Sequence, residues 1–150
     1  MERRKFLSLA VGALALAVTP AAVRAEDFRK MKPKVWKAHK VDDAITAMYG
    51  TTAATKSGVT VTTPDVAANG GAVPVNVKSD ISAKTVSIFQ DANPEAAVIV
   101  FECNKYTIID FDINIKMGAS GTITCIVEGH DGKLYSGTRT LEVAAGGCEG

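Results

Sequence analysis

Most of the chain after Thr51 alternates apolar and polar residues with a period of two, and this pattern constrains the fold more than any other feature. The segment Thr107–Lys116 shows it most cleanly. Isoleucine or phenylalanine occupies every odd position from Ile109 to Ile115, with aspartate or asparagine between them. Successive side chains of a β-strand point to opposite faces, so we expect a strand with one buried and one solvated face.

Seven short segments carry strand signals, and turns rich in Gly, Pro, Asn and Asp separate them. Pro74 should place its strand at a sheet edge, because proline cannot donate a hydrogen bond to a neighbouring strand. The mostly apolar segment Ala96–Cys103 suits a strand covered on both faces. Asp131 and Gly132 form the centre of a hairpin turn. The predicted strands are Val59–Thr63, Val73–Lys78, Val86–Ile88, Ala96–Cys103, Thr107–Lys116, Gly121–Gly129 and Leu134–Val143.

One helix is predicted ahead of the strands, over Val41–Tyr49, and Gly50 is placed to end it. Asp42 and Asp43 lie in its first turn, where they complement the helix dipole and can cap free N–H groups. The residues on its apolar face are Val41, Ile45, Met48 and Tyr49.

Residues 27–40 precede this helix; they are basic, and Pro33 argues against a long regular helix among them. We expect an exposed lead-in that Trp36 anchors to the core. No helix is predicted between the strands, as a parallel α/β fold would require. The chain is therefore predicted to be one all-β domain, an immunoglobulin-like antiparallel β-sandwich with one short N-terminal helix.

The first 25 residues have the three parts of a secretory signal peptide. Arg3-Arg4-Lys5 supplies the basic region, Leu9–Val18 the short apolar run, and Val23-Arg24-Ala25 the small residues of a cleavage site. The paired arginines favour the twin-arginine route, with general secretion as the alternative. We predict cleavage after Ala25, a periplasmic location and no membrane association after cleavage. The predicted units are a twin-arginine-type signal peptide (1–25), a helix plus sandwich domain (26–145) and a C-terminal arm (146–150).

Cleavage would leave 13 basic and 15 acidic residues, a net charge of −2. Nucleic acid and anionic membrane surfaces both select dense positive charge, so neither is a predicted partner. His39 and His130 are far apart in sequence, and the chain has no CxxC, HExxH or CxxCH motif. We therefore predict no metal site and no cofactor.

Cys148 lies in the last five residues, Gly146-Gly147-Cys148-Glu149-Gly150, beyond the last predicted strand. Glycine lacks a Cβ, so this end should form a flexible tether that carries an exposed thiol. Such a tether cannot hold a histidine beside the sulfur, so we do not expect an independent enzyme. Three interpretations stay open: a group that enters the active site of another protein, an interchain disulfide, or a frayed terminus with an incidental cysteine.

The other two cysteines, Cys103 and Cys125, fall on the apolar faces of their predicted strands. They are either core thiols or a disulfide within the sandwich, since an exported protein meets an oxidising compartment. In either case Cys148 is the odd cysteine.

Three stretches together resemble one known family. The stretch Thr63–Val75 is similar to its P-x-x-A-x-N-G-x-x-V-P-V pattern, and Asp131–Tyr135 to its approach to the final strand. The tail resembles its Gly-Gly-Cys-Gly-Gly terminus, with Glu149 in place of one glycine. The family is SoxY, the sulfur-carrier subunit of the thiosulfate-oxidising Sox system.

This resemblance implies an immunoglobulin-like sandwich that pairs with a SoxZ-like subunit and carries substrate on Cys148. It implies that a SoxXA-type cytochrome attaches thiosulfate and that a SoxB-type hydrolase releases sulfate. A SoxCD-type dehydrogenase can process the remaining sulfur. The chain would then be a covalent carrier, not an enzyme; the alternative is an assembly module whose Cys148 forms an interchain disulfide. The implied arm consists of Gly146, Gly147, Glu149 and Gly150 around Cys148.

Overall fold

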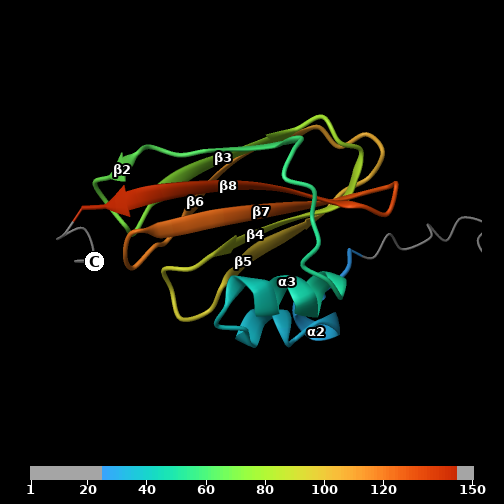
Figure 1. Cartoon of the computed structure of the whole chain (residues 1–150), viewed down its shortest axis with the longest axis horizontal. Coiled ribbons are helices and arrows are strands. Elements are labelled where there is room, and N and C mark those ends of the chain that lie inside the picture. The colour runs from blue at the N-terminus through green and yellow to red at the C-terminus, as the bar shows by residue number, and fades with distance from the viewer. Residues whose placement is uncertain (1–24, 145–150) are drawn as a thin grey trace, which may run out of the picture.

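The computed structural model describes residues 25–144, and it shows two β-sheets packed face to face with short helices beneath one of them (Figure 1). The predicted all-β sandwich is confirmed, and a strand is present at each of the seven predicted positions. A further strand of two residues, β2, is not among those predicted. The elements are α2 (Phe28–Met31), η1 (Val35–Lys37, a 3₁₀ turn), α3 (Val41–Tyr49), β1 (Val59–Thr62), β2 (Val66–Ala67), β3 (Val73–Ser79), β4 (Ala83–Gln90), β5 (Ala97–Glu102), β6 (Ile109–Ile115), β7 (Gly121–Gly129) and β8 (Leu134–Val143).

The smaller sheet has the strand order β1-β3-β6 and is antiparallel throughout. The edge position expected from Pro74 is wrong for its strand, because β3 lies between the other two. β3 can hold a proline in this central position because β1 is short. β1 ends at Thr62, opposite Asn76, and does not reach Pro74. Pro74 pairs only with Asn114 of β6, and proline is tolerated where one side of a strand is unpaired.

The larger sheet has the order β2-β8-β7-β4-β5, with antiparallel pairs throughout except between β2 and β8, which run parallel. Strands β7 and β8 form the predicted hairpin. The Gly129 N–H donates to the Lys133 carbonyl at 2.9 Å, which closes the turn. Gly132 has a φ of 78°, a left-handed conformation that favours glycine and fits the Asp-Gly signal.

The main core lies between the sheets and consists of side chains at the alternate inward positions that the period of two predicts. In β6, Ile109 and Ile115 are buried, and the residues between them alternate between half-buried and exposed. Gly137 of β8 lets β1 of the other sheet approach closely, since a Cβ at this position would lie 2.4 Å from the Val59 carbonyl oxygen of β1. The buried members are Val61, Ala67, Val73, Val75, Val77, Ala83, Val86, Ile88, Ile109, Ile115, Met117, Ile123, Cys125, Val127 and Leu141.

Strand β5 is only half-buried, so the expected full cover on both faces is wrong in degree. The physical reason is that β5 is the edge strand of the larger sheet. Ile99 and Phe101 pack on the main core, while Ala97 and Val100 pack on the opposite face against the helices.

The helical layer, residues 28–49, covers the outer face of the larger sheet, the face turned away from the smaller sheet (Figure 1). The helix α3 matches its prediction, and Gly50 ends it with a φ of 78°. The expected capping by Asp42 and Asp43 is wrong: neither side chain caps the helix, because Lys40 occupies the N-cap position. The second core, between this layer and the sheet, contains Val35, Ala44, Ile45, Met48, Phe89, Ala96, Ile126 and Leu134.

The lead-in has more structure than expected, since α2 and η1 form one turn each on either side of Pro33. Trp36 is half-buried and packs against the second core, as predicted for an anchor. The helices of the described residues are too short and too polar to cross a bilayer.

Candidate functional site

The last strand, β8, is held on both sides up to its final residue. On one side, the N–H groups of Glu142 and Ala144 each donate at 2.9 Å, to the carbonyls of Asp65 and Ala67. On the other side, the Oγ of Ser120 accepts from the N–H of the residue between them at 2.9 Å. We call these five residues, with Val143, the C-terminal anchor. It fixes the point from which the predicted arm leaves the sandwich.

An ion pair adds to the anchor at its surface. The Arg139 guanidinium of β8 contacts the Asp65 carboxylate, but the two side chains are 42% and 86% exposed. Exposed pairs of this kind contribute roughly 0–1 kcal/mol, so the backbone bonds hold the strand end in place.

The stretch that resembles the family pattern, Thr63–Val75, begins at this anchor and ends in the main core. Between β2 and β3 it turns at Asn69, whose Oδ1 accepts from the Gly71 N–H at 2.8 Å. The Gly70 carbonyl then accepts from the Met117 N–H at 2.8 Å, which ties the turn to the segment after β6. The fold therefore brings the internal stretch beside the strand that leads to Cys148.

The predicted site residues at the end of the chain are not among those that the structure describes. Their proposed roles stay predictions from the sequence, as does the signal peptide. The residues concerned are Gly146, Gly147, Cys148, Glu149 and Gly150.

The two described cysteines are free thiols in the structure, at Cys103 and Cys125. Strand β4 lies between their strands; Cys125 pairs with Ile88, and Ile88 pairs with Ile99, four residues before Cys103. The two cysteines are therefore separated by one intervening strand and by about 13 Å along the direction of β5. This is more than the Cα separation of roughly 4–7 Å that a disulfide spans.

Both described thiols are poorly suited to react at neutral pH. Cys125 is fully buried, and burial raises its pKa to about 12. Cys103 is half-buried; its burial and, to a lesser extent, the nearby Glu102 carboxylate raise its pKa. The thiolate is the nucleophilic form of cysteine, so neither residue makes a good carrier thiol.

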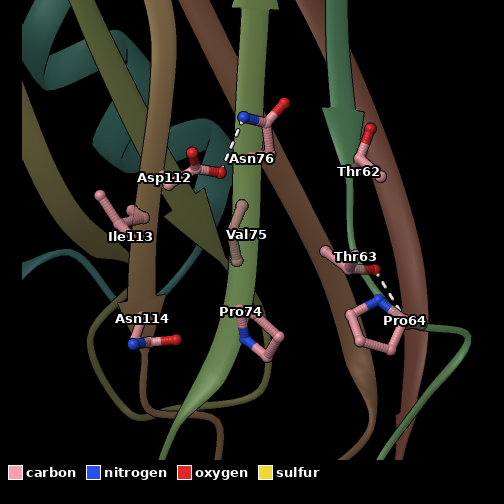
Figure 2. Close-up of a pocket in the computed structure, with 9 residues that line it drawn as sticks. All are labelled: Thr62, Thr63, Pro64, Pro74, Val75, Asn76, Asp112, Ile113 and Asn114. Atoms are coloured by element: carbon pink, nitrogen blue, oxygen red, sulfur yellow. Dashed lines mark hydrogen bonds between the residues drawn. The ribbon is translucent and has the colours of Figure 1, made fainter.

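A groove of about 420 Å³ runs across the outer face of the smaller sheet, where β1 ends and turns away (Figure 2). Asn76 lies at its upper end and donates at 2.9 Å to both Asp110 and Asp112. The hydrogen bond from Asn76 is the main cause that lowers the pKa of Asp110, helped by the Lys78 ammonium at 3.3 Å. Of these two acidic residues only Asp112 lines the groove, and its carboxylate disfavours an anionic ligand. Its lining is Thr62, Thr63, Pro64, Pro74, Val75, Asn76, Asp112, Ile113 and Asn114.

A second polar cluster lies under the helical layer. The Tyr49 hydroxyl lies 2.8 Å from Ser87 Oγ and 3.0 Å from Thr85 Oγ1, and Thr85 donates to Glu128 at 3.0 Å. Burial raises the pKa of Tyr49 to about 12, so the phenol stays protonated. These contacts join α3 to the sheet, and the sequence could not indicate them because Tyr49 and Ser87 are far apart in the chain.

Comparison with known proteins then decides the family. A family model described as "Sulfur oxidation protein SoxY" matches residues 45–148. The solved structure of the sulfur carrier protein SoxY from Chlorobium limicola f thiosulfatophilum is 31% identical, with a TM-score of 0.63, and the match covers 70% of this chain and 96% of that one. No curated protein matches the sequence significantly.

The chain belongs to the SoxY family.

Its fold is shared more widely. A superoxide reductase (neelaredoxin) from Ignicoccus hospitalis is 15% identical with a TM-score of 0.53, over 61% of this chain and 83% of that one. At that identity the likeness concerns the fold alone. Within residues 25–144, no three His, Cys, Asp or Glu side chains gather into a group that could hold a metal ion. His39 bonds instead to the Pro94 carbonyl at 2.7 Å.

The sequence analysis missed one element that helps to build this site, strand β2. Strand β2 has only two residues, too few for a period, yet its parallel pairing with β8 builds half of the C-terminal anchor. The only signal in the sequence was the family-like stretch that surrounds it, Thr63–Val75.

Proposed function

We propose that this SoxY-family chain is a periplasmic covalent sulfur carrier, in which Cys148 holds thiosulfate-derived intermediates and presents them to partner enzymes. The observation that carries the proposal is the family match, which runs through residue 148 and so includes Cys148. The unreactive setting of Cys103 and Cys125 supports the same assignment, because neither offers an accessible thiolate.

The attachment step joins the Cys148 sulfur to the outer sulfur of thiosulfate. The thiol loses its proton, a sulfur–sulfur bond forms, and two electrons pass to a haem cytochrome of the SoxXA type. Hydrolysis by a SoxB-type enzyme then adds water, breaks the bond to the terminal sulfonate sulfur, and releases sulfate and two protons. A persulfide anion is left on Cys148 for oxidation by a SoxCD-type dehydrogenase.

The C-terminal anchor suits such a carrier because it separates a fixed strand end from the tail. Four residues lead from Ala144 to Cys148, a reach of about 13 Å at roughly 3.3 Å per residue. Because the intermediate stays attached to the carrier, it does not diffuse away. Docking of an enzyme then gives the intermediate a high local concentration at that enzyme's active site. Gly146 and Gly147 allow a narrow chain to enter a partner's active site.

The proposal includes export and a partner subunit. Residues 1–25 would direct the chain to the periplasm and be removed after Ala25, and a SoxZ-like subunit would pair with the sandwich to form a heterodimer.

Intact-protein mass spectrometry tests the carrier function directly. The chain is isolated from thiosulfate-grown cells without reductant, and its mass and N-terminus are determined. We expect a mature chain that begins at Glu26 and carries a thiosulfonate or polysulfane adduct on Cys148.

The matched controls are Cys148→Ser, which should abolish the adduct, and Cys103→Ser, which should leave it intact. A bare Cys148 thiol in the presence of all the partner enzymes would refute the carrier function. A protein–protein disulfide at Cys148, with sulfur oxidation intact in Cys148→Ser, would establish the assembly module instead.

A further inference from the structure

The basic and acidic residues of this chain are concentrated in different segments, although its formal net charge is only +1. Residues 28–41 contain six basic residues and no acidic one, whereas residues 42–150 contain seven basic and thirteen acidic residues. The two parts therefore carry net charges of +6 and −6. The basic segment, residues 28–41, lies in the helical layer on the outer face of the larger sheet (Figure 1).

Three of the six cations are engaged by their own chain. Lys30 pairs with Asp27 at 3.3 Å. The ammonium of Lys32 donates to the Met48 carbonyl near the end of α3. The Arg29 guanidinium lies 4.2 Å above the centre of the Trp36 ring. Of these contacts, only the Lys32 bond joins the basic segment to α3; the other two lie within or next to the segment itself.

The other three cations, Lys34, Lys37 and Lys40, are exposed. Within residues 25–144, all three salt bridges involve other residues. Lys34 is the N-cap residue of the 3₁₀ turn η1 and Lys37 is its last residue, and residues three apart in such a turn lie on the same side. Lys40 is the N-cap residue of α3, whose positive dipole end adds to the field, although Asp42 and Asp43 in the first turn offset part of it.

This surface is not part of what relates the chain to its family, because the SoxY match begins at residue 45. The fold also gains little from Lys34, Lys37 and Lys40, because their side chains make no hydrogen bond among the described residues. Their concentration on one layer therefore calls for a role outside the sandwich.

We propose that Lys34, Lys37 and Lys40 form a docking surface for an acidic patch on an enzyme that processes the carrier arm. The inference rests on the proposed function in taking the partner to be such an enzyme. Complementary charge raises the rate of encounter and orients the two proteins before close contact. The basic surface would bring an enzyme to the carrier, and the arm would then deliver its cargo.

The charge of the remaining chain favours a protein partner over an extended polyanion. A membrane or a nucleic acid presents negative charge over a wide area, which the acidic residues of the sandwich would repel. The segment also lacks the exposed aromatic side chains of membrane-surface helices, since Phe28 and Trp36 pack against the second core. A patch of limited size on a protein matches three lysines that lie within seven residues of one another.

Association kinetics at varied ionic strength test this surface. The carrier isolated from its host is mixed with the purified oxidising cytochrome, hydrolase and dehydrogenase in turn. The variant Lys34→Glu/Lys37→Glu/Lys40→Glu should slow association with at least one enzyme roughly tenfold to a hundredfold at low salt. The difference from wild type should shrink steadily as salt is added.

The matched control is Lys56→Glu/Lys105→Glu/Lys116→Glu, which changes the net charge equally at three exposed lysines outside the helical layer. It should slow association much less. Equal slowing by both triple variants would assign the effect to net charge and overturn the docking surface. Unchanged rates with all three enzymes would overturn it too, as would lysine-dependent binding to phosphatidylglycerol vesicles without any effect on the enzymes.

The two proposals fail in different ways. If wild-type Cys148 carries no sulfur adduct, the carrier function fails whatever the association rates are. If the adduct forms on Cys148 but wild type and both triple variants associate with all three enzymes at equal rates, the carrier function stands and the docking surface fails. Circular dichroism of each variant confirms that the fold is intact before the rates are compared.

Discussion

The inner face of the larger sheet packs mainly through apolar side chains, whereas its outer face also buries hydroxyl groups. On β4, Val86 and Ile88 point into the main core, and both are fully buried. The alternate residues Thr85 and Ser87 point to the helical layer and are also buried, at 7% and 0% exposure. One strand thus serves two cores of different chemistry.

The difference shows how the two cores are specified. On the inner face of β4, Val86 and Ile88 have no polar side-chain atom that needs a partner, so shape and burial decide how they pack. The outer face also buries the hydroxyls of Thr85 and Ser87 beside the second core, and an unpartnered buried hydroxyl costs roughly 1–3 kcal/mol. Tyr49 supplies the partner for both Thr85 and Ser87, so hydrogen bonds fix where α3 lies on the sheet.

A matched pair of substitutions separates the two cores. Ile88→Ala in the main core and Ile45→Ala in the second core remove the same atoms, and each should cost about 2–5 kcal/mol where it acts. We expect Ile88→Ala to lower the global free energy of unfolding. Ile45→Ala should act mainly by opening the helical layer, because α3 can separate while the two sheets stay packed.

Denaturation followed by two probes distinguishes these outcomes. The chain has one tryptophan, Trp36, so its emission reports the helical layer, while far-UV circular dichroism reports mainly the strands. The two transitions should coincide for Ile88→Ala and separate for Ile45→Ala. Coincident transitions in both variants would show that the two cores unfold as one unit.

Removal of one hydroxyl tests the polar contacts of the second core. Tyr49→Phe keeps the ring but leaves Ser87 with only a long 3.5 Å contact to the Ile126 carbonyl. We expect a loss of about 1–2 kcal/mol in the free energy of unfolding near neutral pH. Tyr49→Phe combined with Ser87→Ala should recover part of this loss, because it removes both partners.

The same variant changes the dependence of stability on pH. Burial raises the Tyr49 pKa from 10.0 to about 12, so the folded state holds this proton more tightly than the unfolded state. Its contribution is complete below about pH 10 and declines as the pH rises towards 12. The stability difference between wild type and Tyr49→Phe, measured by urea titration from pH 8 to 11, should therefore shrink above pH 10. Tyr135, whose pKa is also raised, is common to both proteins.

Local patterns predicted the main core and α3 because each is encoded in consecutive residues. The alternation from Ile109 to Ile115 and the face that contains Ile45 and Met48 depend on no distant partner. The position of Pro74 could not be predicted in this way, because it depends on where β1 ends rather than on β3 itself. A long-range property of the sheet decided it.

The same distinction between local and long-range features applies to the candidate site. The sequence singled out Cys148 and the stretch Thr63–Val75 through family-like motifs, but nothing local placed that stretch beside the end of β8. Two-residue strands and bonds such as that between Ser120 and Val143 leave no periodic signal. The charge of the basic segment was visible in the sequence, whereas its assembly on one layer required the fold.

The smallest expected effect concerns the rim of the second core. Arg29→Ala removes a cation that lies 4.2 Å above the Trp36 ring at an exposed position. Such contacts contribute about 0.5–1 kcal/mol at exposed sites, so the variant should shift the Trp36 emission and loosen the helical layer only slightly. Arg29→Lys should keep part of the contact, and the strand signal should not change in either variant. A loss as large as that of Ile45→Ala would mean that the helical layer is held by its basic rim rather than by its buried face.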